Sequence, residues 1–274
     1  MQNNLKISFI GGGNMAAALI GGLAGKLTAA ANIHVVDINA DALAKLQQQF
    51  GVSTSPAIDA AVAASDVVVL SVKPQQMKDV VAQLKPYIKT QLILSIAAGI
   101  RAIDLSRWLG GHNAIVRTMP NTPALIGKGV TGLVATAGVS AEQRAAADAI
   151  LRAVGETVWL DDEKLIDPVT AVSGSGPAYV FYFLEAMQQA AQEMGLTAEQ
   201  GNALAISTFV GAAQLAAQST DPIATLRERV TSKGGTTYAA LTSMEESGVK
   251  DAIIKAMKAA AARGQALGEE FGRD

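Results

Sequence analysis

Short, mainly apolar runs alternate with helical segments over the first part of the chain. Such runs stand at residues 6–10, 33–36, 67–72 and 92–96. They suit strands of a parallel sheet that is covered on both faces. Helices are predicted at about residues 14–24 and 41–50, and further strands near 114–117, 129–135 and 156–159. The alternation predicts right-handed β-α-β units and an α/β fold with a doubly wound sheet.

The pattern changes to helices alone after residue 162. Pro177 follows Gly176 at a predicted helix start, and Thr197 with Gln200 forms a capping-box pattern. Asp221-Pro222 predicts the start of a short helix, and Gly195, Gly248 and Gly268 are predicted helix ends. We therefore expect a sheet domain at residues 1–162 and an all-helical domain at residues 163–274.

One predicted helix carries an apolar stripe at helical spacing. Its members are Tyr179, Tyr182, Phe183, Ala186, Met187 and Ala190. The stripe suits either the core of the helical domain or an interface with a second copy. The two interpretations are compatible if the domain is completed by its copy.

Composition and charge exclude several classes of protein. The formal net charge is −2, which does not predict a basic nucleic-acid surface, and there is no cysteine for a disulfide framework or thiolate chemistry. We expect no membrane span, because no run reaches about 18 apolar residues. The N-terminus also lacks the long apolar run of a signal peptide, so a cytoplasmic protein is expected.

A glycine loop follows the first predicted strand directly. Gly11, Gly13 and Ala16 fit the pattern G-x-G-x-x-[GA] at the opening of a helix. Gly11 allows the tight turn, Gly13 lets the backbone approach a pyrophosphate, and Ala16 keeps the helix close to the sheet. The alternative is a merely structural turn. The strand, loop and helix in this order favour a Rossmann-like dinucleotide site.

The second predicted strand ends at an acidic residue. An acid at the position of Asp37 accepts hydrogen bonds from the adenine ribose and disfavours a 2′-phosphate. We place Asp37 and nearby Asn39 in the cofactor site; alone, they favour NADH. The alternative is a turn formed by the Asp-x-Asn sequence.

The chain lacks the usual signs of a strong catalytic acid, nucleophile or metal site. His34 and His112, the two histidines, are both expected to be structural. Polar loops remain at residues 116–123, 172–178 and 231–237. The last suits a carboxylate, because Gly234-Gly235 exposes backbone amides and a helix start follows. The alternative is that one of the threonines is simply the N-cap of that helix.

From end to end the chain resembles pyrroline-5-carboxylate reductase, through the segments IGGGNMA, SVKPQ, SIAAGI, MPNTPALIGKG, VSGSGPAYVF and VTSKGGTTYAAL. The resemblance implies NAD(P)H-dependent reduction of (S)-1-pyrroline-5-carboxylate to L-proline, the last step of proline biosynthesis. It also implies a helical domain that interlocks with that of a second subunit, and dimers that can assemble into decamers. The active site would form where the first domain faces helical elements, including those of the partner.

The resemblance also implies roles for individual residues. The residues matched to the cofactor site are Gly11, Gly13, Asn14, Met15, Ser71, Val72, Lys73, Pro74, Ala97, Ala98 and Asn121. Those matched to the substrate site are Met119, Asn121, Gly235, Thr236 and Thr237. Thr237 matches the threonine that hydrogen-bonds the ring nitrogen, and it is the expected catalytic residue. A protonated imine is already electrophilic, so positioning can replace a strong acid.

Two positions depart from the family pattern. Lys233 stands where many members have proline, and Asp37 stands where NADPH-using members often have a small or basic residue. Family habit favours NADPH, whereas Asp37 alone favours NADH, so we expect NADPH or NADH as the cofactor. The alternatives are a hydroxyacid dehydrogenase, another imine reductase, or a dinucleotide sensor without turnover. Residues 173–184 lack the lysine that a hydroxyacid enzyme would carry there.

Overall fold

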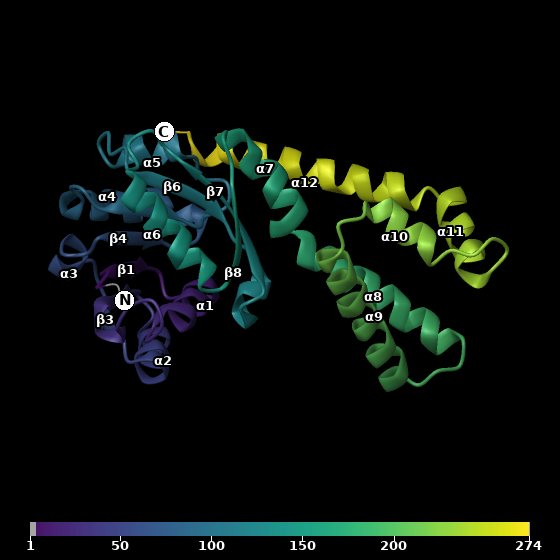
Figure 1. The fold of residues 1–274 in the computed structure, drawn as a ribbon. Coiled ribbons are helices and arrows are strands. Elements are labelled where there is room, and N and C mark those ends of the chain that lie inside the picture. The colour runs from purple at the N-terminus through teal and green to yellow at the C-terminus, as the bar shows by residue number, and fades with distance from the viewer. Residues whose placement is uncertain (1–3, 274) are drawn as a thin grey trace. The chain divides into compact units, whose positions relative to one another are not determined.

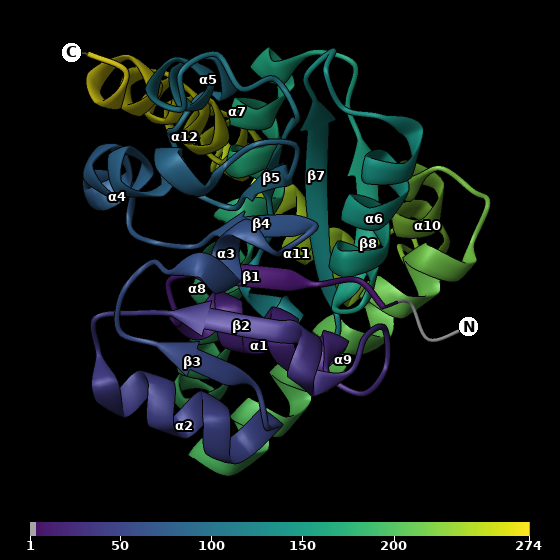
Figure 2. The same cartoon turned by 90° about the vertical axis from the view of Figure 1, so that its left-hand side faces the viewer.

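The computed structural model describes residues 4–273 and divides the chain into two compact units. The first unit runs to Ser175 and takes in the chain again from Ala259; the second is Gly176–Lys258. The first unit is built on an eight-stranded sheet with the order β3-β2-β1-β4-β5-β6-β7-β8 (Figures 1 and 2). The strands are β1 (Ile7–Ile10), β2 (Ile33–Val36), β3 (Ser53–Ser55), β4 (Val67–Leu70), β5 (Leu92–Ser95), β6 (Ile115–Met119), β7 (Gly129–Ala135) and β8 (Gly155–Trp159). Only the β6–β7 pairing is antiparallel.

Both faces of this sheet are apolar, which explains the uninterrupted strand sequences. Along β4, Val67 and Val69 pack into one core, while Val68 and Leu70 pack into the other. The first core takes in α1 (Asn14–Leu23), α2 (Ala40–Phe50) and α6 (Ala141–Arg152). The second takes in α3 (Ala60–Ala63), α4 (Met77–Leu84) and α5 (Ala102–Trp108). The doubly wound α/β prediction is confirmed.

The sheet has one strand that the apolar pattern did not predict. β3 is a polar three-residue strand, Ser-Thr-Ser, at the edge of the sheet beside β2. An edge strand of this kind has little apolar surface to bury, so its sequence carries no hydrophobic signal.

The second unit is helical, as predicted. It contains α8 (Gly176–Glu193), α9 (Ala198–Gln218), α10 (Ile223–Arg229), α11 (Thr236–Glu246) and the first part of α12 (Val249–Phe271). Thr197 and Gln200 form the predicted capping box of α9, and Gly195 and Gly248 have the left-handed backbone typical of helix ends. None of the described helices is long and apolar enough to cross a bilayer.

Helices begin before the second compact unit does. α8 begins at Gly176, as predicted, but α7 (Ile166–Val169) and the π-helical turn η6 (Thr170–Gly174) precede it in place of the expected loop. Ile166 and Ala171 are buried in the first unit. The change to helical sequence near residue 162 and the division of compact units after Ser175 therefore fall at different places.

Gly268 is not a helix end, contrary to the sequence prediction. It lies inside α12, and a Cβ built there would come 2.8 Å from Nε of Arg101. Arg101 also donates from Nη2 to the carbonyl oxygen of Gln265 (3.3 Å). The glycine therefore serves close packing of an arginine on the helix rather than termination.

Candidate functional site

The glycine loop between β1 and α1 has the geometry expected of a dinucleotide site. Gly11 has φ +106°, and a Cβ there would lie 2.8 Å from the carbonyl carbon of Ser71. Gly13 is the N-cap of α1, so no side chain caps the helix, and a Cβ built on it meets no atom within 4 Å. The start of α1 therefore combines open space with free backbone donors and the positive end of a helix dipole, a combination that fits a pyrophosphate.

Asp37 joins the end of β2 to this loop. Its Oδ2 accepts the Gly12 N–H at 2.6 Å, and its Oδ1 accepts the Asn39 N–H at 2.8 Å. The second contact is the Asp-x-Asn turn that the sequence left as an alternative, and the first is a separate interaction with the glycine loop. Asn39 also caps α2, accepting hydrogen bonds from the N–H groups of Asp41 and Ala42.

A pocket of about 770 Å³ and another of about 500 Å³ lie in the first unit, and the smaller one is at the glycine loop. The predicted cofactor residues that line the smaller pocket are Gly11, Gly13, Asp37, Asn39, Ser71, Val72 and Lys73. Asn14, Met15, Pro74, Ala97, Ala98 and Asn121 are not among its lining residues. Asn14 and Met15 form the start of α1, while the side chain of Ala97 is packed in the second core.

The pocket also has lining residues that the sequence did not single out. Three of them, Pro56, Ala57 and Ile58, directly follow the unpredicted strand β3 and line the pocket. Ile38 lines it too and is 87% exposed. The signal for these residues is their position at the carboxyl ends of β2 and β3, where ligands bind in open α/β sheets.

Asn121 holds loops together in this structure. Its Oδ1 accepts the Val130 N–H (2.9 Å), and its Nδ2 donates to the carbonyl oxygen of Ser173 (3.2 Å). Met119, at the end of β6, lies against Gly174 of the π turn, because a Cβ on that glycine would meet the Met119 Cε at 2.6 Å. The two residues therefore connect the carboxyl end of β6 with the turn that leads into α8.

The predicted carboxylate loop lies in the second unit. Its helix, α11, begins at Thr236, two residues earlier than predicted, so Thr236 and Thr237 are in its first turn. Gly235 is the N-cap, which excludes the alternative that a threonine caps the helix. α1 and α11 therefore both begin on a glycine N-cap, leaving their first amides available for an anion.

Both histidines bond within the fold. Nδ1 of His34 lies 3.5 Å from the Ser8 hydroxyl, and its Nε2 lies 3.8 Å from a carboxylate oxygen of Asp59. Burial lowers the pKa of His34, against the opposing effect of the Asp59 charge. Nε2 of His112 is 2.9 Å from the carbonyl oxygen of Gln91. Within the described residues no group of His, Asp and Glu side chains is placed to hold a metal ion.

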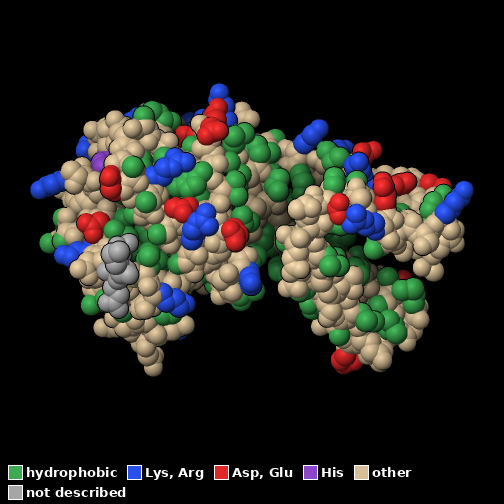
Figure 3. Space-filling view, viewed as in Figure 1, with side chains coloured by type: hydrophobic (Ala, Val, Ile, Leu, Met, Phe, Trp, Pro, Cys, Tyr) green, Lys and Arg blue, Asp and Glu red, His purple; other side chains and the backbone are tan. Residues whose placement is uncertain are grey.

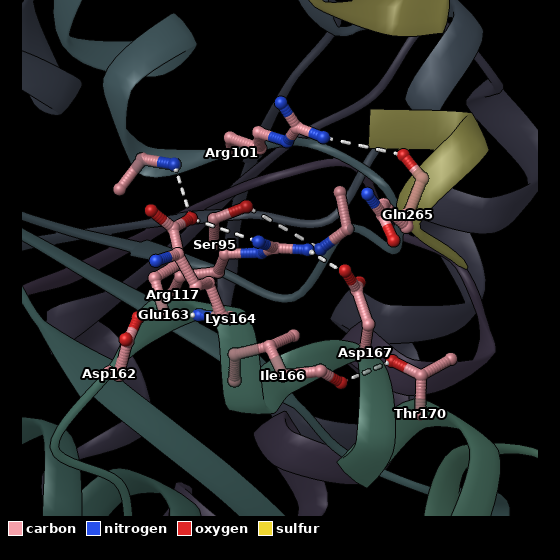
Figure 4. Close-up of polar contacts among 12 residues, drawn as sticks. Ser95, Arg101, Arg117, Asp162, Glu163, Lys164, Ile166, Asp167, Thr170 and Gln265 are labelled. Atoms are coloured by element: carbon pink, nitrogen blue, oxygen red, sulfur yellow. Dashed lines mark hydrogen bonds and ion pairs between the residues drawn. The ribbon is translucent and has the colours of Figure 1, made fainter. Parts of the chain in front are cut away.

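The larger pocket, of about 770 Å³, is lined by an ion-pair cluster that is centred on the buried Arg117 (Figure 4). Arg117 is 3% exposed and donates from Nη1 to a carboxylate oxygen of Glu163 at 2.9 Å, while Asp167 lies 3.8 Å from its Nη2. The same Glu163 oxygen accepts the Ala102 N–H, so it joins α5 to β6. Burial raises the pKa of Asp167, although Arg117 and Arg101 oppose the shift.

The two acids of this cluster should differ in their contribution to stability. Glu163→Gln is expected to lower the free energy of unfolding by about 2 kcal/mol, because a buried guanidinium loses its hydrogen-bonded counter-charge. Asp167→Asn is expected to change it by less than about 1 kcal/mol at neutral pH, since burial already disfavours this charge. Urea denaturation of both variants measures the difference. Equal losses would contradict the assignment of Glu163 as the main partner.

Much of the apolar surface of the second unit is exposed in a single chain (Figure 3). In the predicted stripe Tyr182 is 73% exposed and Met187 is 39% exposed, whereas Phe183 packs at 6.4 Å from the ring of Phe209. Other exposed apolar side chains of this unit are Phe181, Leu204, Val210, Leu215, Ile223, Val230 and Met244. Surface of this kind on helices is typical of a subunit interface.

Comparison with known proteins agrees with both units. Residues 163–267 match the family model described as pyrroline-5-carboxylate reductase dimerisation, and residues 6–99 match the one described as NADP oxidoreductase, coenzyme F420-dependent. The chain is 49% identical to the pyrroline-5-carboxylate reductase of Pseudomonas aeruginosa, over 98% of each chain. The solved reductase from Coxiella burnetii has a TM-score of 0.90 and 39% identity, covering 97% of this chain and 99% of that one. The Plasmodium falciparum enzyme, solved with NADP bound, has a TM-score of 0.88 and 29% identity over 98% of this chain and 99% of its own. The chain therefore belongs to the pyrroline-5-carboxylate reductase family.

Proposed function

We propose that this protein reduces (S)-1-pyrroline-5-carboxylate to L-proline with NADPH or NADH, the last step of proline biosynthesis. The proposal depends on two features of the one chain. The first is the pocket of about 500 Å³ at the glycine loop, here called the dinucleotide pocket, and the second is the uncapped, glycine-started helix α11, whose first turn bears two threonines. A bound nicotinamide supplies the hydride. The rest of the chemistry falls to the groups that hold the imino acid.

The carboxylate of the substrate suits the start of α11. Backbone N–H groups of Gly235, Thr236 and Thr237 and the positive end of the helix dipole favour an anion there. Fixing the carboxylate also fixes the direction of the ring. The Thr237 hydroxyl then holds the ring nitrogen, which keeps its proton while C5 receives the hydride.

The cofactor is held in this proposal by residues that line the dinucleotide pocket and by others next to it in the sequence or matched through the family resemblance. Gly13 and the first turn of α1, including Asn14 and Met15, hold the pyrophosphate; Asp37 and Asn39 take the adenine ribose. The end of β4 is followed by Ser71, Val72, Lys73 and Pro74, and the end of β5 is followed by Ala97 and Ala98; we assign both segments to the cofactor. The nicotinamide is bordered by Met119 and Asn121. The open space around Gly13 and the close contact of Gly11 with Ser71 support this placement.

The protein is an oligomer in this proposal. The exposed apolar side chains of α8 and α9 and the match to a dimerisation model support a homodimer formed through residues 163–274, with 1–162 as the dinucleotide domain. From the family resemblance we further propose that dimers assemble into decamers. From composition, charge and the N-terminal sequence we propose that the enzyme works in the cytoplasm and that neither nucleic acid nor a membrane is a partner. Each active site would then use helical elements of both subunits.

The proposed reaction is tested by initial rates of NADPH and NADH oxidation with pyrroline-5-carboxylate, beside a panel of hydroxyacids in the oxidative direction. We expect activity on the imino acid and none on the hydroxyacids. Oxidation of a hydroxyacid without activity on pyrroline-5-carboxylate would favour the rival class of dehydrogenase.

A further inference from the structure

We propose that Asp37 makes this enzyme select NADH over NADPH, against the habit of its family. The proposal concerns the adenosine end of the dinucleotide pocket and rests on the proposed function. Its basis is the charge and hydrogen bonding at the end of β2.

The carboxylate of Asp37 is held by two backbone donors. Gly12 N–H reaches Oδ2 at 2.6 Å, and Asn39 N–H reaches Oδ1 at 2.8 Å. Rotation away from the pocket would break both hydrogen bonds. Each carboxylate oxygen can still accept another hydrogen bond, which suits ribose hydroxyls. A 2′-phosphate brings negative charge and few protons to donate near neutral pH, so it meets a fixed like charge.

The pocket offers no cation at that end to offset this repulsion. Among the described residues that line it, Lys73 is the one cation. Lys73 comes after β4, and β1 lies between β4 and β2, whose end carries Asp37. Two strand spacings separate the backbones at these two strand ends by roughly 10 Å, which is more than a lysine side chain spans. Ile38 is exposed at this end and brings no charge.

The start of α2, the other possible anion site, is already occupied. Asn39 Oδ1 accepts the N–H groups of Asp41 (3.1 Å) and Ala42 (3.2 Å), and the Asn39 carbonyl accepts that of Leu43. The helix dipole is therefore satisfied by the chain itself.

A structural turn alone would not require this arrangement. The Asp-x-Asn turn uses only the Oδ1 contact with Asn39. The Oδ2 contact reaches across to Gly12, within the loop that fits the pyrophosphate. Asp37 thus connects the ribose end of the pocket to the glycine loop.

The test compares NADH and NADPH on the purified full-length protein, by fluorescence titration of binding and by kcat/KM with pyrroline-5-carboxylate. We expect the wild type to favour NADH by about tenfold or more. Asp37→Ser should lower that ratio by about tenfold, and Asp37→Ser with Ile38→Arg should reverse it in favour of NADPH. Thermal melting identifies a variant that has lost its fold, and Asp37→Asn, which keeps an acceptor, then replaces Asp37→Ser.

Asp41→Asn is the matched control, because it removes the same charge close by, from a residue that does not line the pocket. It should leave the NADH/NADPH ratio within about twofold. Wild-type binding of NADPH as tight as that of NADH, or an equal shift in Asp41→Asn, would overturn the proposal. The titration needs no imino acid, so selection for NADH without turnover of pyrroline-5-carboxylate would count against the proposed reaction alone.

Discussion

Thr237→Ala is expected to lower kcat for pyrroline-5-carboxylate by about one hundredfold, while the dissociation constant for NADH changes less than about twofold. The hydroxyl lies in the first turn of α11, where Gly235 leaves the helix uncapped. Removing it takes away the group assigned to the ring nitrogen. Thr237 is assigned to the imino acid, whereas the residues of the dinucleotide pocket belong to the first unit, so cofactor binding should persist. Steady-state kinetics and fluorescence titration measure the two effects.

Thr242→Ala provides the matched control for this change. It is the same substitution on the same helix, but the Thr242 hydroxyl donates to the carbonyl oxygen of Tyr238 within the helix. Its kinetics should stay within about twofold of the wild type. Thr237→Ser keeps a hydroxyl and should restore most of the turnover. Wild-type kinetics in Thr237→Ala would remove Thr237 from the mechanism.

Gly11→Ala is expected to lose both stability and dinucleotide binding. Its φ of +106° is costly for a residue with a Cβ, and that Cβ would lie 2.8 Å from the carbonyl carbon and oxygen of Ser71. The backbone strain and the clash together should lower the free energy of unfolding by about 3 kcal/mol or more. The displaced loop should also bind NADH at least about tenfold more weakly. Thermal melting and fluorescence titration report the two losses.

Two other glycines separate these causes. Gly25 has φ +73° with no atom within 4 Å of a built Cβ, so Gly25→Ala carries only the backbone strain, about 1–2 kcal/mol. Gly13 has φ −72°, and a Cβ built on it meets no atom within 4 Å. The Gly13→Ala protein should therefore keep the stability of the wild type and lose only affinity for the dinucleotide. If Gly11→Ala were no less stable than Gly25→Ala, the close contact with Ser71 would not hold in solution.

The sequence predicted those parts of the fold that depend on local hydrophobic pattern and capping. The predicted positions hold for the buried strands β1, β2, β4 and β5 and for the capping box of α9. β3 did not, because a polar edge strand is defined by its neighbour β2 and not by its own residues. The prediction of a helix end at Gly268 was wrong, because this glycine leaves room for the side chain of Arg101, which is distant in sequence.

The candidate site shows the same division. The glycine pattern identified Gly11 and Gly13, and the end of the second strand identified Asp37. Each could be identified because its role depends on its own position in the strand–loop–helix unit. Pro56 to Ile58 line the pocket only because β3 pairs with β2, and no motif marks them. The link between Asp37 and Gly12 depends on the spacing of β2 and β1, which sequence patterns do not measure.

The most direct test of the proposed reaction follows the hydride itself. The protein is incubated with pyrroline-5-carboxylate and NADH carrying deuterium at the transferred position of C4, and the product is analysed by mass spectrometry and NMR. We expect L-proline with one deuterium at C5 and none on the nitrogen, because the nitrogen-bound proton exchanges with water. Absence of proline, or proline without deuterium at C5, would contradict it.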